Sequence, residues 1–225
     1  MAHSLSVQLN AVEVTALLED ILEQRIFSEP YRVFALACHL DLPDHARAAA
    51  KETLHHPVFY RLESFFRSPE FHLINTSTLL SLYAYRAECV SSVRGLLHSL
   101  LQLSLGELER TKIIVPWWMG SEHHSAACGP RFADGLTRSG AEDNTMVTPA
   151  PWFVNHIKRA ARVAEVGPTG GAVAASLCDW QEAFPEVVHC GLCGREGGAG
   201  LRELAVFVHK IIDTITVRKD FTKQL

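Results

Sequence analysis

Two cysteines near the C-terminus are the residues whose spacing most clearly allows chemistry. Cys190 and Cys193 stand in the run Cys-Gly-Leu-Cys-Gly, which is a CxxC motif followed by glycine. Two thiolates at this spacing can bind one soft metal ion, and the glycine allows the backbone to turn tightly behind them. Because a closed zinc site needs four ligands, this motif supplies only half of one.

Cys128 and His124 are the ligands that we expect to complete such a site. Their His-x-x-x-Cys spacing suits two ligands of one ion, and the glycine-containing chain around them can fold against the CxxC motif. Alternate ligands are His123, His189 and Cys178. We therefore predict a structural Zn²⁺ held by Cys128, Cys190, Cys193 and His124, and no other cofactor. The alternative is that these side chains do not converge and that the thiols are simply buried.

The CxxC motif also occurs in thiol–disulfide enzymes, where it begins a helix that follows a strand. Residues 180–189 contain a proline and two acids and predict no such strand. The chain has neither a Gly-x-Ser-x-Gly elbow nor a His-Glu-x-x-His pair, and its glycine-rich runs lack the Gly-Lys-Ser/Thr end of a phosphate-binding loop. We expect a protein without catalytic residues. The alternative is a zinc-dependent or thiol-redox enzyme centred on Cys190 and Cys193.

Composition and charge limit the class of protein. The chain has 225 residues, of which 48% are hydrophobic and 20% charged, so it can bury one large core or two small ones. A net charge of −4 gives no electrostatic footprint for nucleic acid. No run of apolar residues predicts a membrane span, and six cysteines without a secretory signal fit a reducing compartment. We expect an intracellular protein of the cytoplasm or nucleus with protein partners, and its oligomeric state stays open.

Apolar periodicity interrupted by prolines predicts helices in the first part of the chain. Asn10-x-x-Glu13 resembles a capping box, so a helix is expected from about residue 10, after a flexible or truncated N-terminus over residues 1–9. Its apolar positions are Leu9, Val12, Leu17, Leu18, Ile21 and Leu22. Ser28 is the expected cap of a second helix that begins at Pro30, and Pro43 opens a third that ends before Pro57.

A longer helix is expected from Leu79 to about Leu105, capped by the hydroxyls of residues 76–78. Its expected buried face consists of Leu80, Tyr83, Cys89, Val93 and Leu97. Residues 10–118 are thus predicted to form one helical region, and residues 119–150, rich in glycine, serine and histidine, a variable loop or linker.

Two further helices and the CxxC turn are expected in residues 151–225. One helix should run from Trp152 to about Glu165 and end at a glycine run, and the last should run from Leu201 to about Val217. The predicted fold is therefore mainly α: stacked antiparallel helices with a loop-rich, zinc-stapled C-terminal part.

The order of these motifs resembles the region that follows the BTB/POZ domain in proteins of mushroom-forming fungi. The matching runs are FSEPYRVFALAC (27–38), LPDHARAAA (42–50), TLHHP (53–57) and LLSLYAYRAEC (79–89). Trp152, the CxxC motif and the final helix complete the order, so that the resemblance covers residues 10 to 217. The β-rich body of the BTB fold, which would precede residue 10, has no counterpart in the sequence.

This resemblance implies a non-catalytic protein–protein interaction module whose helices present faces to another protein. In the family such a region belongs to adaptor or scaffold proteins, including ubiquitin-ligase adaptors and transcription-associated proteins. Because the BTB body is missing, the usual dimerisation surface of the family is expected to be absent or truncated.

Overall fold

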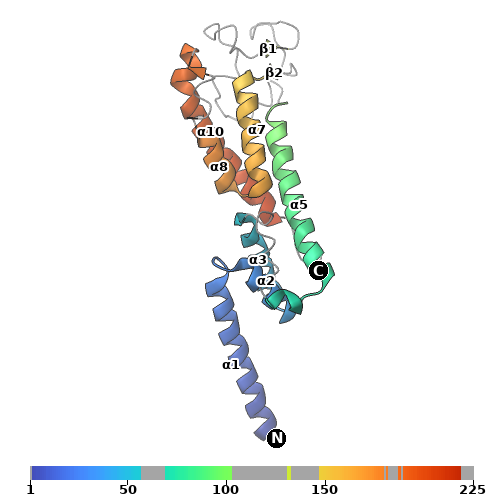
Figure 1. Cartoon of the computed structure of the whole chain (residues 1–225). Helices are drawn as coiled ribbons and strands as arrows, with labels where there is room; N and C mark the ends of the chain where they lie inside the picture. The colour runs from blue at the N-terminus through green and yellow to red at the C-terminus, as the bar shows by residue number, and fades with distance from the viewer. Residues whose placement is uncertain are drawn as a thin grey trace. The chain divides into compact units, whose positions relative to one another are not determined.

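The computed structural model describes residues 2–56, 69–102, 131–132, 147–179, 181, 187–188 and 190–218. The helices, labelled in Figure 1, are α1 (Ala2–Arg25), α2 (Pro30–His39), α3 (Pro43–Glu52), α5 (Thr76–Ser99), α7 (Pro151–Val166), α8 (Gly170–Cys178) and α10 (Gly191–Arg218), with 3₁₀ helices η1 (Thr53–His55) and η2 (Pro69–Leu73). Two short strands, β1 (Arg131–Phe132) and β2 (Val147–Thr148), pair antiparallel. The predicted mainly α fold is confirmed. No helix among the described residues is long and apolar enough to cross a membrane.

The chain divides into two compact units, and the boundary lies between Ala87 and Glu88, inside α5. Among the described residues, unit 1 comprises α1, α2, α3, η1, η2 and the first half of α5, and unit 2 the elements that follow. Most of residues 119–150, the predicted variable loop or linker, lie outside the described part of the chain, so that this call stays a prediction.

Helix α1 begins earlier than the capping-box pattern predicted. It starts at Ala2, so that Asn10 lies within the helix and residues 2–9 are helical where a flexible end was expected. No proline or glycine occurs between Ala2 and Arg25, and nothing in the sequence therefore stops the helix from extending toward its N-terminus. The structure thus assigns residues 2–9 to a helix, and the flexible or truncated N-terminus over residues 1–9 stays a prediction.

Prolines start α2 and α3 as predicted. Pro30 and Pro43 each occupy the first turn of their helix, where the fixed φ of proline is suitable and its missing N–H is not needed. Between the helices Asp41 has a φ of 56°, a left-handed conformation that lets the chain reverse. The expected cap of α2 is wrong, because the Ser28 hydroxyl donates instead to the carbonyl of Arg25 at the end of α1.

The core of unit 1 consists of closely packed helices with buried polar contacts at the junction of α3 and η1. Small side chains let α2 and α3 pack closely, and those at most 1% exposed are Ala35, Ala37, Ala46, Ala49 and Ala50. The buried Arg86 donates to the Thr53 carbonyl at 2.9 Å, and the Tyr31 hydroxyl donates to the same oxygen at 3.4 Å. Since the last carbonyls of a helix have no partner within it, a cation here stabilises the helix end. Burial raises the pKa of Tyr31 to about 12, against the opposing effect of Arg86.

Helix α5 differs from its prediction at both its cap and its first buried turns. The Asn75 side chain, one residue before the helix, accepts the backbone N–H of Thr78 at 2.8 Å and is therefore the cap. Leu80 is 61% exposed, whereas Leu82 and Tyr85 are 4% and 3% exposed. The expected burial of Cys89, Val93 and Leu97 is confirmed. The buried face recurs every three or four residues from Leu82, a register that excludes Leu80.

The core of unit 2 is formed by α5, α7, α8 and α10. Its most deeply buried large side chains are Leu97, Phe153, Ile157, Leu177, Leu201, Leu204 and Ile212. The predicted helix from Trp152 to Glu165 is confirmed as α7. Helix α8 was not predicted. The Thr169 hydroxyl caps it by accepting the backbone N–H of Ala172 at 3.3 Å.

Helix α10 contains the predicted helix from Leu201 to Val217 but starts ten residues earlier, at Gly191. Five glycines precede Leu201 within it, and glycine disfavours helix in isolation. Two of them, Gly197 and Gly200, are buried. Burial in the folded chain therefore outweighs the weak local preference, and the expected CxxC turn is the first turn of α10.

Candidate functional site

The CxxC motif lies at the N-terminal end of α10, within the core of unit 2. Cys190 directly precedes the helix and Cys193 belongs to its first turn. Their residues are 1% and 0% exposed and share one apolar cluster with Val187, Leu201 and Leu204. Such an environment is typical of cysteines that pack as small apolar side chains. A thiol that exchanges with a substrate disulfide must be accessible to that substrate.

The other predicted zinc ligands fall mostly outside the described residues. His123, His124, Cys128 and His189 belong to that part of the chain. Cys178 is described and lies exposed at the end of α8. Within the described residues no three His, Cys, Asp or Glu side chains converge in a way that could hold a metal. The zinc site stays a prediction.

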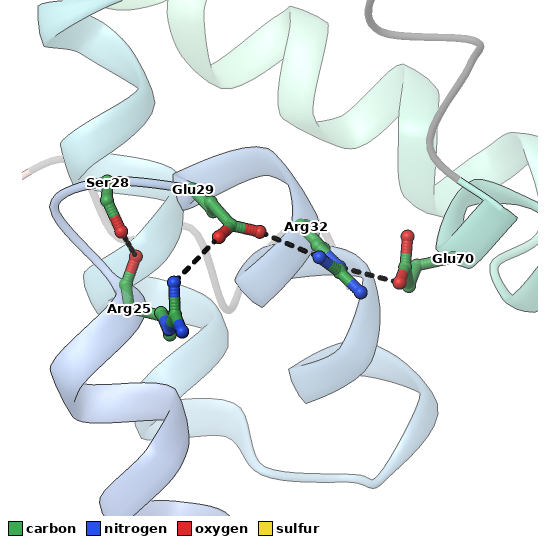
Figure 2. Close-up of polar contacts among 5 residues, drawn as sticks. All are labelled: Arg25, Ser28, Glu29, Arg32 and Glu70. Atoms are coloured by element: carbon green, nitrogen blue, oxygen red, sulfur yellow. Dashed lines mark hydrogen bonds and ion pairs between the residues drawn. The ribbon is translucent and has the colours of Figure 1, made fainter.

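A chain of ion pairs fixes the end of α1 to its neighbours in unit 1, as Figure 2 shows. Glu29 accepts from Arg25 at 3.1 Å and from Arg32 at 2.9 Å, and Arg32 also donates to Glu70 of η2 at 2.6 Å. Hydrogen bonds from Arg32 to Glu29 and Glu70 raise the pKa of Arg32 above its usual value. Each of these carboxylates is paired with an arginine, so the cluster joins α1, α2 and η2.

A stripe of large apolar side chains on α1 is exposed. We call it the α1 stripe: Val14, Leu17, Leu18 and Ile21, which are 56%, 60%, 37% and 46% exposed. The spacing i, i+3, i+4, i+7 places all four on one face of two successive helical turns. On the same helix Leu22 is only 4% exposed and packs into unit 1. Contiguous exposed apolar surface marks interaction sites more often than scattered apolar residues do.

His156 is a buried polar residue that the sequence analysis did not single out. It is 1% exposed, and its Nε2 lies 2.9 Å from the Leu177 carbonyl of α8. Because a carbonyl only accepts, Nε2 carries the hydrogen, and Nδ1, 3.4 Å from an Arg159 nitrogen, accepts. Both ring nitrogens are thus engaged, and the side chain joins α7 to α8. The only sequence signal was its four-residue spacing from Trp152, which is also buried.

A shallow groove of about 340 Å³ lies between α5 and α7 within unit 2. Leu97, Ile157 and Ala161 line it, with the cations Arg94 and Lys158 beside them. Arg94 is already paired with a carboxylate of α7, that of Glu165, at 3.0 Å. His98 of α5 also lines the groove, and its Nε2 lies 3.1 Å from the side-chain nitrogen of Gln102.

Comparison of the chain with protein-family models, curated proteins and solved structures found no match. The resemblance to the region after a fungal BTB/POZ domain therefore stays an expectation. Among the described residues, the α1 stripe places four exposed large apolar side chains on one helical face.

Proposed function

We propose that this chain is a non-catalytic protein–protein interaction module that acts as an adaptor or scaffold. The observation that carries the proposal is the exposure of the α1 stripe. Leaving large apolar side chains in water is unfavourable, and a surface that covers them gains roughly 25 cal/mol for each Å² removed from water. A partner protein supplies such a surface.

The α1 stripe is presented on a helix whose end is anchored. Leu22 packs into unit 1, and the ion pairs that join Arg25, Glu29 and Arg32 hold the junction between α1 and α2. A partner therefore meets a formed helix end and does not need to order it, which lowers the entropic cost of association. The motif order shared with the region after fungal BTB/POZ domains supports an adaptor or scaffold role.

The proposal is tested by quantitative affinity purification of the tagged full chain. The test variant is Leu17→Glu with Ile21→Glu, which places two carboxylates on the α1 stripe. The matched control is Val206→Glu, which changes a single apolar residue of α10 that is 58% exposed. Far-UV circular dichroism establishes that both variants keep the helical content of the wild type.

At least one protein recovered with the wild type and with Val206→Glu should be depleted at least about tenfold in the double variant. We expect this depletion because binding would bury the two introduced carboxylates without partners, which is energetically unfavourable. Recovery of the same proteins in the same amounts with all three chains would overturn the proposal.

A further inference from the structure

We propose that the α1 stripe binds a cationic amphipathic helix of a partner protein. This inference rests on the proposed function and specifies the partner's chemistry. From Val14 to Ile21 the stripe spans eight residues, and the two ends lie about 10.5 Å apart along the helix axis. Apolar anchors at i, i+3, i+4 and i+7 match the same spacing on a second helix, which is how helix pairs interlock.

The charges of α1 indicate that the partner helix is positively charged. Between residues 13 and 25 the helix has the carboxylates Glu13, Glu19, Asp20 and Glu23, and its one arginine, Arg25, already pairs with Glu29. At 100° per residue, Glu13 and Asp20 lie about 40° and 60° from Leu17, on the same flank of the stripe. Lysine or arginine side chains at the edge of a partner helix would therefore meet carboxylates beside the apolar contact.

The same charges disfavour two other binding partners of an apolar helix face, namely a second copy of the chain and a lipid surface. A second copy of the chain would bring its own Glu13 and Asp20 to the contact, and like charges across an interface are unfavourable. An anionic lipid surface attracts basic helices and repels an acidic one. A stripe of two turns also buries much less than the roughly 1,200 Å² of a stable interface, so the contact with the cationic helix is weak and reversible.

The probe for this inference is a synthetic helical peptide of about five turns, with leucines at i, i+3, i+4 and i+7 and lysines on both flanks. The matched control peptide has glutamate in place of every lysine. Binding of each fluorescently labelled peptide to the full chain is measured by anisotropy. We expect the cationic peptide to bind with a Kd of the order of micromolar and the acidic peptide at least about tenfold more weakly. Added salt should weaken the cationic complex.

Two variants separate the apolar from the electrostatic contribution. Leu17→Glu with Ile21→Glu should abolish binding of the cationic peptide, and Val206→Glu should leave it unchanged. Glu13→Gln with Asp20→Asn keeps every apolar side chain of the stripe and should reduce the preference for the cationic peptide severalfold, about 0.8 kcal/mol for a fourfold change. Because this variant alters only exposed residues, it also tests the inference if the first variant does not fold.

Three results would each overturn the inference. The two peptides could bind equally, neither could bind, or the preference for the cationic peptide could be unchanged in Glu13→Gln with Asp20→Asn. Self-association, measured by sedimentation, that Leu17→Glu with Ile21→Glu abolishes would also overturn the inference, because it would identify a second copy as the occupant. If the peptides fail while affinity purification still shows partners lost from the stripe variant, the interaction-module function stands and only the cationic helix is rejected.

Discussion

Replacement of Gly170 by alanine should destabilise unit 2, although alanine is the better helix former. Gly170 is the first residue of α8, and α10 passes directly against it. A Cβ at this position would meet the His209 ring, the Asp213 carboxylate at 2.6 Å and the His209 carbonyl oxygen at 2.7 Å. The two side chains can rotate away at the cost of their 3.1 Å ion pair, but the carbonyl belongs to the backbone of α10.

The size of the expected loss in stability follows from the distance by which α10 would have to move away from α8. Ordinary contact begins at 3.4 Å, so α8 and α10 must separate by about 0.7 Å (3.4 minus 2.7). Overpacking of this kind typically costs about 1–3 kcal/mol. The better helix propensity of alanine offsets at most about 1 kcal/mol. We therefore expect a net loss of about 1–2 kcal/mol in the free energy of unfolding.

The adjacent Gly171 provides the matched control, because a Cβ there meets nothing within 4 Å. Gly171→Ala should leave stability unchanged or raise it by up to about 1 kcal/mol, since only helix propensity changes. Urea unfolding followed by far-UV circular dichroism measures both variants. A Gly170→Ala protein as stable as the wild type, or an equal loss in Gly171→Ala, would refute the close packing of α8 on α10.

Two further predictions concern titration and thiol reactivity. The pKa of Tyr31 is about 12 in the folded chain and 10 when unfolded, so the unfolded state releases its proton first and stability should fall as pH rises from 10 to 12. Urea unfolding between about pH 9 and 11.5 should show a shallower fall in Tyr31→Phe, and equal slopes would contradict the buried hydroxyl. In the native chain, maleimide should label the exposed Cys178 before the buried Cys190 and Cys193, as read by mass spectrometry. Equal labelling rates would contradict the burial of Cys190 and Cys193. Elemental analysis that finds no zinc in the purified protein would reject the predicted metal site.

Helix starts at prolines could be predicted from the sequence because they depend on local geometry. Pro30 and Pro43 fix their own φ and lack an N–H, so each favours the first turn of a helix whatever surrounds it. The positive φ of Asp41 between them is equally local. The mainly α class followed from the same kind of signal, repeated along the chain.

The glycine-rich elements could not be predicted in this way. Glycine runs favour turns locally, yet α8 begins at Gly170 and α10 continues through Gly197 and Gly200. At Gly170 the reason is tertiary, because the missing side chain permits α10 to approach closely, and that contact exists only after the chain has folded. Gly197 and Gly200 are buried, which is likewise decided only in the folded chain. The zinc hypothesis has the same limit, since spacing within Cys190-x-x-Cys193 says nothing about where a distant Cys128 lies.

Periodicity in the sequence indicates which residues share a helical face, but the packing of other elements decides whether that face is buried. Periodicity assigned Leu17, Leu18, Ile21 and Leu22 alike to an apolar pattern, but among them only Leu22 is buried. Likewise Leu80 and Leu82 of α5 are equally hydrophobic, and only the second meets the core. A repeat of 3.6 residues is encoded by the chain, whereas burial depends on which other elements pack against it.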